Sequence, residues 1–275
     1  MIVRSRDLFN RNVRVAITTK EFGSLHPKRP DFAEQLARLL RVTNGGDVAL
    51  FPQLGFTDQL AWATGARSGV VAPFPDHKGN LIPAFLRPLA KTDGAISPNL
   101  PLAMCNADCP AGIGLTSPDA RGHQHLVFTH LGLMAMISKE GRPSLLKQVV
   151  DTLAVVGMHL EQFWVGFGAQ PCCYGLGHND DRWGLIDPWQ SSELVVEKGP
   201  RAGQRAVDLG VMARAQLVAF GMPFEDVQVD DYCTCCSGED DPQAGLHHSN
   251  LMRCDQHERN GIIAWRTDPN SPARA

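Results

Sequence analysis

A cysteine with reactive neighbours interrupts an apolar stretch of the chain. Residues 106–112 read NADCPAG inside LPLAMCNADCPAGIGLTS, and His130 follows in the apolar segment HLVFTHLGL. If these two segments are adjacent antiparallel strands, the thiol of Cys109 and the imidazole of His130 can face each other. Such a pair is either a nucleophile with its base or half of a metal site, and Asp108 could orient His130 or accept a proton. A packed thiol beside an unrelated histidine is the alternative without chemistry.

The remaining cysteines form two groups. Because adjacent side chains point to opposite faces of an extended chain, we expect Cys172 and Cys173 to pack rather than to share a metal. The second group is CTCC at 233–236, and after it come further possible ligands, namely His247, His248, Cys254 and His257. Its spacing comes near that of zinc modules without matching it, so an independent structural zinc is the less favoured interpretation.

The composition narrows the class of protein and of partner. The chain has 275 residues, of which 43% are hydrophobic and 20% charged, and its net charge is -3. Because the chain has no basic run, we expect a small-molecule partner rather than a nucleic acid or a membrane, while the sequence leaves a protein partner open. The N-terminus has no signal-peptide pattern, and eight cysteines then indicate thiols or metal ligands in a cytoplasmic protein.

Alternating strands and single helices must position these residues. Strands are predicted over 12–23, 100–115, 125–133 and 224–236, the second and third being antiparallel neighbours joined by the polar turn SPDARGHQ. Helices are predicted over 29–42, 144–162 with Ser144 as its N-cap, and 204–221, where Val207, Val211, Ala215 and Val218 line one apolar side. This order favours the α+β class, a single-domain α/β sandwich with mixed sheets over residues 1–266, followed by a disordered tail at 267–275.

Taken in order, the landmarks resemble those of the bacterial polyphenol oxidase or laccase-domain family, also called the peptidoglycan-editing factor family. The matching segments run over nearly the whole chain: AITTKEFGS, TDGAIS, NADCPAGI, THLGLMA, GFGAQPCCYGL, VDLGVMARAQLVAFG, YCTCC and HHSNLMRCDQHERNGIIAW. Each segment alone is a weak signal, but the ordered set is specific.

The resemblance implies an α/β sandwich that acts on purine nucleosides by hydrolysis, phosphorolysis or deamination. It implies a zinc ion held by histidine, cysteine and histidine, with Cys109 and His130 as two of the ligands. Older descriptions of the family give copper-dependent oxidation of phenols. Because clustered histidines are scarce in this chain, copper is the less favoured cofactor. The matching segments also make substrate-binding candidates of three residues, Gln53, Ser249 and Arg259.

The chain departs from the family pattern at the metal site. The segment FPQLGFTDQ puts Gly55 where the family has its first histidine, and Leu133 and Met134 stand where it has tryptophan and arginine. A catalytic zinc normally has three protein ligands, so a replacement is needed. The histidines that remain open for that role are His77, His123, His125 and His178.

Three functions follow from these observations. The first is a family-like zinc enzyme with a recruited ligand. The second is a catalytically silent member that binds a small molecule or a protein. The third is a metal-free thiol hydrolase or deamidase in which His130 takes the proton of Cys109, as in the glutamine-deamidating bacterial toxins whose fold the family resembles.

Overall fold

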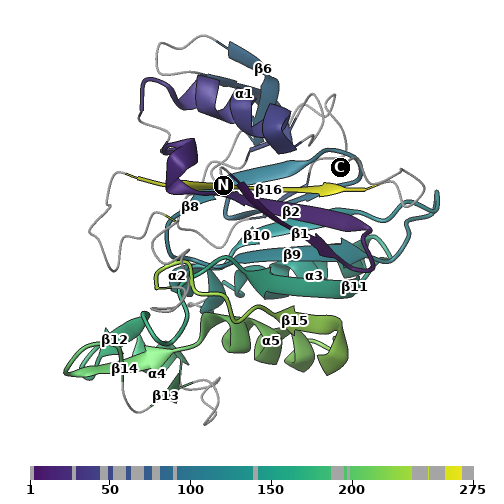
Figure 1. Ribbon diagram of the computed structural model, residues 1–275. Helices are drawn as coiled ribbons and strands as arrows, with labels where there is room; N and C mark the ends of the chain where they lie inside the picture. The colour runs from purple at the N-terminus through teal and green to yellow at the C-terminus, as the bar shows by residue number, and fades with distance from the viewer. Residues whose placement is uncertain are drawn as a thin grey trace.

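Two β-sheets packed face to face form the centre of the protein, and helices cover their outer faces (Figure 1). The computed structural model describes residues 3–26, 29–43, 49–51, 60–62, 71–75, 81–88, 92–138, 142–186, 195–196, 199–236, 247 and 258–267. Together these layers make a single domain with mixed sheets, which confirms the predicted fold class.

The first sheet has seven strands in the order β1-β2-β16-β8-β3-β6-β5. Along the chain they are β1 (Val3–Leu8), β2 (Val13–Thr18), β3 (Ala49–Leu50), β5 (Val71–Pro75), β6 (Leu81–Pro88), β8 (Leu102–Asn106) and β16 (Asn260–Arg266). β16, the last strand of the described residues, lies in the middle of this sheet, antiparallel to both β2 and β8. The two ends of the described chain are therefore tied together.

The second sheet has six strands in the order β15-β11-β9-β10-β7-β4. Along the chain they are β4 (Leu60–Trp62), β7 (Gly94–Ser97), β9 (Ala111–Thr116), β10 (Leu126–His130), β11 (Leu160–Gly166) and β15 (Val227–Val229). β9 and β10 form the predicted antiparallel hairpin, whereas β15 runs parallel to β11. In the hairpin turn, the Asp119 carboxylate accepts the backbone N–H groups of Arg121 and His123.

Alternation along the strands builds the core between the sheets. In β2 and β16, Val15 and Ile262 face the second sheet, while their neighbours Ala16 and Ile263 face outward. In the second sheet, Phe128 meets them from β10. Because side chains alternate between the two faces of a strand, each central strand contributes to two cores, so hydrophobic residues occupy nearly every position.

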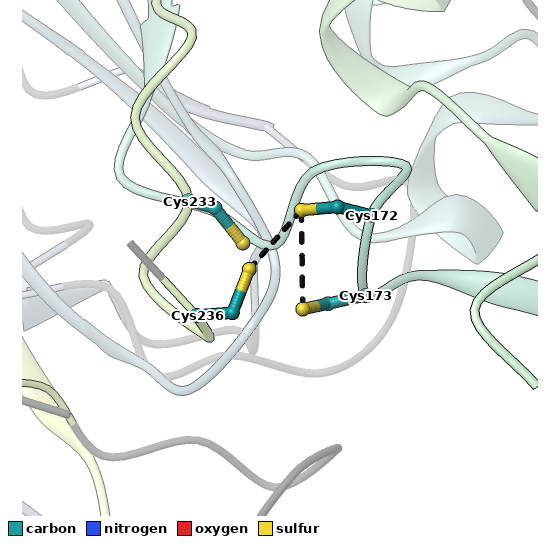
Figure 2. Close-up of side chains that lie close together, drawn as sticks. All are labelled: Cys172, Cys173, Cys233 and Cys236. Atoms are coloured by element: carbon teal, nitrogen blue, oxygen red, sulfur yellow. Dashed lines mark hydrogen bonds between the residues drawn. The ribbon is translucent and has the colours of Figure 1, made fainter. Parts of the chain in front are cut away.

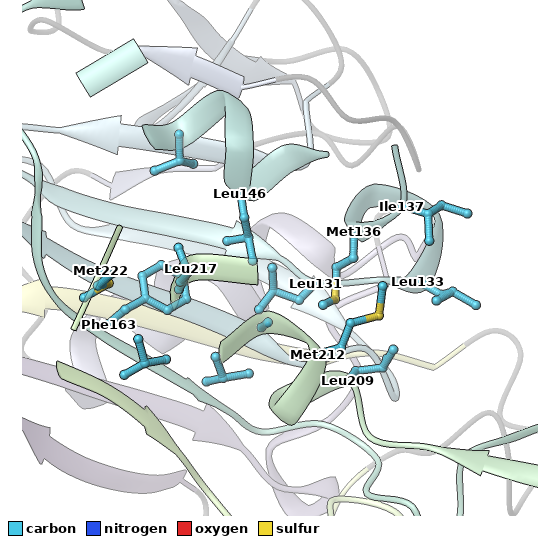
Figure 3. Close-up of a cluster of buried hydrophobic side chains, with 14 of the residues drawn as sticks. Leu131, Leu133, Met136, Ile137, Leu146, Phe163, Leu209, Met212, Leu217 and Met222 are labelled. Carbon is cyan, nitrogen blue, oxygen red and sulfur yellow. The ribbon is translucent and has the colours of Figure 1, made fainter. Parts of the chain in front are cut away.

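Each outer face is closed by helices. α1 (Phe32–Thr43) packs on the first sheet, and α2 (Leu133–Met136), α3 (Leu145–Val155) and α5 (Leu209–Ala219) pack on the second, as the cluster in Figure 3 shows. Ser144 caps α3 as predicted, accepting the backbone N–H of Lys147. β9 approaches β11 closely because Gly112 has no side chain: a Cβ atom there would lie 2.6 Å from the Phe163 ring.

A small third sheet projects beyond the helices of the second sheet. It has the order β12-β14-β13, and its strands are β12 (Gly175–Gly177), β13 (Val195–Val196) and β14 (Gln204–Val207), with α4 (Trp183–Ile186) beside it (Figure 1). The 3-10 turns of the described chain are η1 (Lys20–Phe22) and η3 (Phe224–Asp226).

Several sequence predictions about elements were wrong in part. The predicted helix 144–162 ends at Val155, and Leu160 already begins β11. The predicted strand 12–23 is strand only over Val13–Thr18, and the turn η1 follows it. Residues 100–115 do not form one strand but two, because β8 and β9 belong to different sheets. Residues 204–207 are strand β14, so the helix begins only at Leu209, and it buries Met212, Ala213 and Leu217 rather than the predicted Val218, which is 39% exposed. Within the predicted strand 224–236, only Val227–Val229 is strand.

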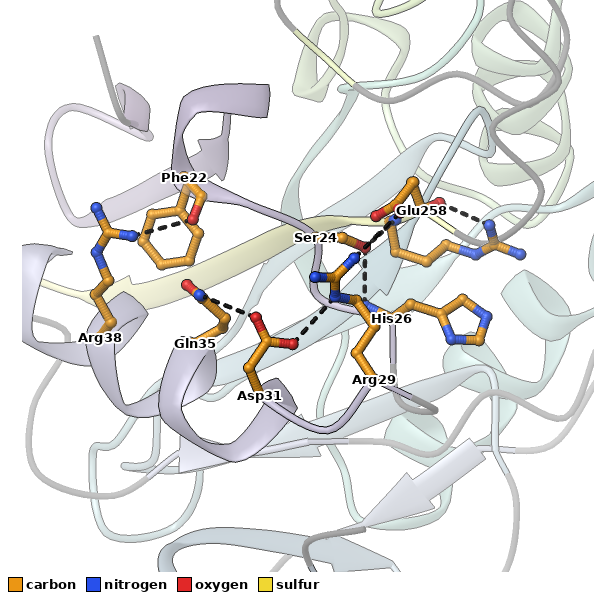
Figure 4. A network of polar contacts seen from close by, with 9 residues as sticks. Phe22, Ser24, His26, Arg29, Asp31, Gln35, Arg38 and Glu258 are labelled. Atoms are coloured by element: carbon orange, nitrogen blue, oxygen red, sulfur yellow. Dashed lines mark hydrogen bonds and ion pairs between the residues drawn. The ribbon is translucent and has the colours of Figure 1, made fainter.

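A polar network fixes the segment before α1 to the start of β16 (Figure 4). Arg29 bridges Asp31, at 3.0 Å, and Glu258, at 3.2 Å. Ser24 Oγ accepts the backbone N–H groups of His26 and Arg259. These bonds hold the segment before α1 against the start of β16.

Among the helices that the structure describes, none has the length and apolar character that a membrane span requires.

Only the first residue of the predicted tail is described. Thr267 donates its backbone N–H to the carbonyl of Asn12. The rest of the predicted tail, 268–275, lies outside the described residues.

Candidate functional site

Cys109 lies in the loop that carries the chain from one sheet to the other. β8 ends at Asn106 in the first sheet, and β9 begins at Ala111 in the second. The Asn106 amide nitrogen donates to the carbonyls of Cys109 and Phe167, the latter at 3.1 Å. The loop is therefore held by a side chain from the first sheet and by backbone from the second.

The segment after β11 packs directly against this loop. Ala169 donates its backbone N–H to the Asp108 carbonyl at 2.8 Å. A Cβ atom at Gly168 would lie 2.5 Å from Pro110, so only glycine permits this approach. The proline and the aspartate beside Cys109 thus fix a crossover loop rather than interrupt a strand.

His130 ends β10 and is almost fully buried, with Asp93 as its carboxylate partner. The two residues form a double contact: the backbone N–H of His130 donates to the Asp93 carbonyl at 2.6 Å, and Nδ1 of the ring lies 3.1 Å from Asp93 Oδ1. Both side chains are buried, at 3% and 0% exposure. Asp93 directly precedes β7, the strand that pairs with β10, so the sheet itself sets this contact.

The structure brings Cys109 and His130 together beside Gly132. A Cβ atom at Gly132 would lie 3.4 Å from Cys109 Sγ and 3.2 Å from His130 Cε1. Burial lowers the pKa of His130, but the charge and hydrogen bonding of Cys109 and Asp93 outweigh burial and raise it to about 10. This arrangement favours the protonated, imidazolium form of His130.

Tyr174 belongs to the same neighbourhood. Burial raises the pKa of its hydroxyl, and the nearby Cys109 raises it further. The half-buried ring also packs against the hydrophobic cluster under α3 and α5. Its hydroxyl is therefore a neutral hydrogen-bonding group near the thiol.

The structure does not place the other predicted site residues at the contact between Cys109 and His130, or does not describe them. Asp108 is 8% exposed and joins the loop through its backbone, but the carboxylate on His130 Nδ1 is that of Asp93. Arg259 donates to the Glu258 carbonyl, and its charge acts on Cys105, which packs on the α1 side of the first sheet. Three further positions, Gln53, Ser249 and Gly55, lie outside the described residues.

Asp93 was not among the predicted site residues. Its sequence signal is the TDG directly before a buried strand, which resembles the A-D-A segment of the family. The pattern could have placed a carboxylate at a strand end, but only the pairing of β7 with β10 shows that this carboxylate reaches His130.

A zinc ion at this pair is only partly supported by the described residues. A thiolate, and an imidazole whose other nitrogen binds a carboxylate, are donors typical of zinc sites. His125 cannot supply the third ligand, because it lies at the opposite end of β10, about 16 Å from His130 at ~3.3 Å per residue, where its ring contacts Asp119. His123 lies in the turn still further from His130 and donates its backbone N–H to the same carboxylate. His178 lies beside β12, and His77 is outside the described residues.

A second possible metal site among the described residues is formed by four cysteines, separate from the Cys109–His130 pair. The sulfur atoms of Cys172, Cys173, Cys233 and Cys236 all lie within 4.8 Å of one another (Figure 2). The sequence prediction that Cys172 and Cys173 point to opposite faces was wrong, because residues 170–174 form a turn in which Gln170 accepts the N–H groups of Cys173 and Tyr174. Both thiols therefore lie in the same cluster.

Parallel pairing of β11 with β15 explains how these distant cysteines meet. Parallel strands leave a sheet at the same end, and the pairing continues as a bridge between Gly168 and Cys233. Thr234 donates its backbone N–H to the Gly168 carbonyl at 3.1 Å. Of the three cysteines in CTCC, the structure thus selects the pair with C-x2-C spacing for this cluster.

His247 does not join the cysteines. It is buried, with Nδ1 at 2.9 Å from the Thr18 carbonyl and Nε2 at 3.1 Å from the Tyr232 hydroxyl. Both ring nitrogens therefore have protein partners. The other predicted ligands of this region, His248, Cys254 and His257, lie outside the described residues.

Comparison with known proteins gives one family and several similar folds. The family model described as multi-copper polyphenol oxidoreductase laccase matches residues 48–240, more than two thirds of the chain. No curated protein sequence matches.

Three solved structures share the fold. Bacillus licheniformis hypothetical protein YfiH has a TM-score of 0.63 at 15% identity, with 93% of each chain covered. YlmD from Geobacillus stearothermophilus has a TM-score of 0.60 at 20% identity, over 94% of this chain and 93% of that one. Neisseria meningitidis protein NMB0706 has a TM-score of 0.63 at 14% identity, over 98% and 100%.

Proposed function

Because the chain belongs to the multi-copper polyphenol oxidoreductase laccase family, we propose that it is an enzyme acting at the Cys109–His130 site. Its proposed reaction is the zinc-dependent hydrolysis, phosphorolysis or deamination of a purine nucleoside or a related small molecule. The observation that carries the proposal is the contact of His130 with both Cys109 and the buried Asp93 carboxylate. A histidine oriented in this way is typical of catalytic and metal-ligating sites.

Each residue of the proposed site has its own role in the reaction. Asp93 holds the ring through Nδ1, so the other nitrogen, Nε2, is the one that can coordinate or exchange a proton. A bound zinc ion would be held by Cys109, His130 and a third ligand, and it would lower the pKa of a water molecule toward neutrality. Asp108, in the same loop, is the proposed proton acceptor, and Tyr174 is a neutral donor near the thiol.

A metal-free thiol hydrolase or deamidase is the second candidate. The specific observation in its favour is that Asp93, His130 and Cys109 follow the order of acid, base and nucleophile in a catalytic triad. In that mechanism His130 takes the thiol proton, the thiolate forms a covalent bond to the substrate carbon, and the protonated His130 returns the proton to the leaving group. Water then releases the product.

Activity and metal content measured together test both candidates. The wild-type chain and the variants Cys109→Ala and His130→Ala are assayed with adenosine, inosine and guanosine, with and without phosphate. For the zinc enzyme we expect turnover to fall by at least about 100-fold in each variant, and bound zinc at this site to be lost. Cys105→Ser is the matched control, because serine can retain the bond that the buried Cys105 thiol donates to the Leu25 carbonyl.

The outcomes separate the alternatives. Turnover that survives complete metal removal, together with rapid alkylation of Cys109 that slows in His130→Ala, identifies the thiol enzyme. If no nucleoside is turned over and Cys109 alkylates no faster than an ordinary thiol, the proposal is wrong and a binding role remains.

A further inference from the structure

We propose that Cys172, Cys173, Cys233 and Cys236 bind one zinc ion in a structural site separate from the Cys109–His130 pair. This site needs neither of those two residues, so it does not depend on the proposed function. The four sulfur atoms already lie close together, and they come from two loops that leave the second sheet at the same end (Figure 2).

The sulfur spacing fits a single tetrahedral ion. Zinc–thiolate bonds of about 2.3 Å give a tetrahedron whose sulfur–sulfur edges are about 3.8 Å. Cys172 Sγ lies 3.9 Å from Cys173 Sγ, close to this edge, and 3.2 Å from Cys236 Sγ, a pair that would have to separate slightly. All the sulfur–sulfur distances are within 4.8 Å, so small side-chain movements bring the four atoms onto one tetrahedron. A disulfide between Cys172 and Cys236 would need the opposite movement, to about 2.05 Å.

The backbone around the cluster is suited to thiolate ligands. Cys233 and Cys236 have the C-x2-C spacing of a zinc knuckle. The backbone N–H of Gln170 donates to Cys233 Sγ at 3.3 Å, and the N–H groups of Cys235 and Cys236 also bond to it. Such donors stabilise negatively charged sulfur, and a cysteine that binds a metal is a thiolate.

Burial and ligand number give the site a structural role. Cys173 and Cys233 are buried, Cys236 is half-buried and Cys172 is exposed, so an ion can reach the cluster from the solvent side. Four protein ligands leave no open position for a substrate. Binding releases the thiol protons to solvent and changes no oxidation state.

The bound ion would brace the loop that carries Cys109. It would join residues 172–173 to residues 233–236, and the segment between β11 and Cys172 already contacts the loop through Ala169 and Gly168. The metal would thereby fix the distance between Tyr174 and Cys109. It would act on the active site only through position.

Zinc content and coordination in a chain without the Cys109–His130 pair test this proposal. The double variant Cys109→Ala/His130→Ala, purified under reducing conditions from zinc-containing medium, should retain one zinc per chain. X-ray absorption at the zinc edge should show four sulfur neighbours at about 2.3 Å. Adding Cys172→Ser or Cys236→Ser should lower the zinc content at least tenfold at a fixed chelator concentration, whereas adding Cys105→Ser should not.

Each alternative outcome is distinct. The proposal is overturned if the double variant holds no stoichiometric zinc, if its zinc has nitrogen or oxygen neighbours, or if mass spectrometry finds a Cys172–Cys236 disulfide in protein isolated under reducing conditions without a chelator. If the serine variants fail to fold, four-sulfur absorption in the double variant still supports the site. Loss of nucleoside turnover alone bears only on the proposed function, because the double variant lacks that site by design.

Discussion

Replacing Asp93 with asparagine removes the charge next to His130 while keeping the shape of the side chain. Asp93 Oδ1 lies 3.1 Å from His130 Nδ1, and both groups are buried, so solvent screens this contact weakly. Asparagine can still accept a hydrogen bond from Nδ1. The Asp93→Asn variant therefore isolates the charge of the contact from its geometry.

The expected effect is a lower pKa of His130. An opposite charge at this distance raises the pKa of a histidine by about 1 to 3 pH units, and the wild-type pKa is raised from 6.5 to about 10. Because the folded-state pKa is raised, the stabilisation from His130 is fully present below pH 6.5 and is lost as the pH rises through about 10. Asp93→Asn should therefore cost about 1 to 4 kcal/mol of unfolding free energy near pH 6 and little above pH 10.

Nuclear magnetic resonance titration of the His130 ring in metal-free protein measures the pKa, and urea unfolding at pH 6 and pH 10 measures the stability. Asp119→Asn is the matched control, because Asp119 Oδ2 lies 3.1 Å from His125 Nε2 at the far end of β10. The control should leave the titration of His130 unchanged. An unchanged His130 pKa in Asp93→Asn, or equal stability loss at both pH values, would refute the electrostatic role of Asp93.

Three further predictions concern the scaffold. Ser144→Ala should cost about 1 kcal/mol in urea unfolding, because the side chain caps α3. Gly112→Ala should cost about 1 to 3 kcal/mol or more, because its Cβ atom would meet Phe163 at 2.6 Å, whereas Gly184→Ala, with open space around it, should leave stability unchanged or slightly raised. In the native protein, Cys105 should resist iodoacetamide until unfolding, because burial raises the pKa of its thiol; peptide mass spectrometry reads this out, and labelling at the rate of a free thiol would contradict it.

Local patterns predict the class of fold but not which sheet each strand joins. Alternating apolar residues identify β2 and β10, and the polar turn between β9 and β10 identifies their hairpin. The apolar run 100–115 looks continuous because β8 and β9 are both buried on two faces. Pairing with β16, more than 150 residues away, is what assigns β8 to the first sheet, and no local signal carries that information.

Local sequence predicts one part of the candidate site but not the parts that depend on distant strands. The contact of Cys109 with His130 follows from a hairpin, so spacing along the chain was sufficient to predict it. Asp93 and the four-cysteine cluster depend on pairings between distant strands, β7 with β10 and β11 with β15. The cysteine prediction also failed because it assumed an extended chain where residues 170–174 turn.

The crossover between the two sheets sets when the site can form. The β9–β10 hairpin, which carries His130, needs only neighbouring sequence and can fold early. The Asn106 amide, which holds the Cys109 carbonyl, lies at the end of β8 that pairs with β16, where Asn106 is opposite Asn260. We therefore expect a chain that still lacks β16 to have the histidine in place before the cysteine loop. Although β16 lends no side chain to the Cys109–His130–Asp93 contact, its pairing with β8 positions the loop that carries Cys109, so we expect the thiol to join His130 only after β16 has been synthesised.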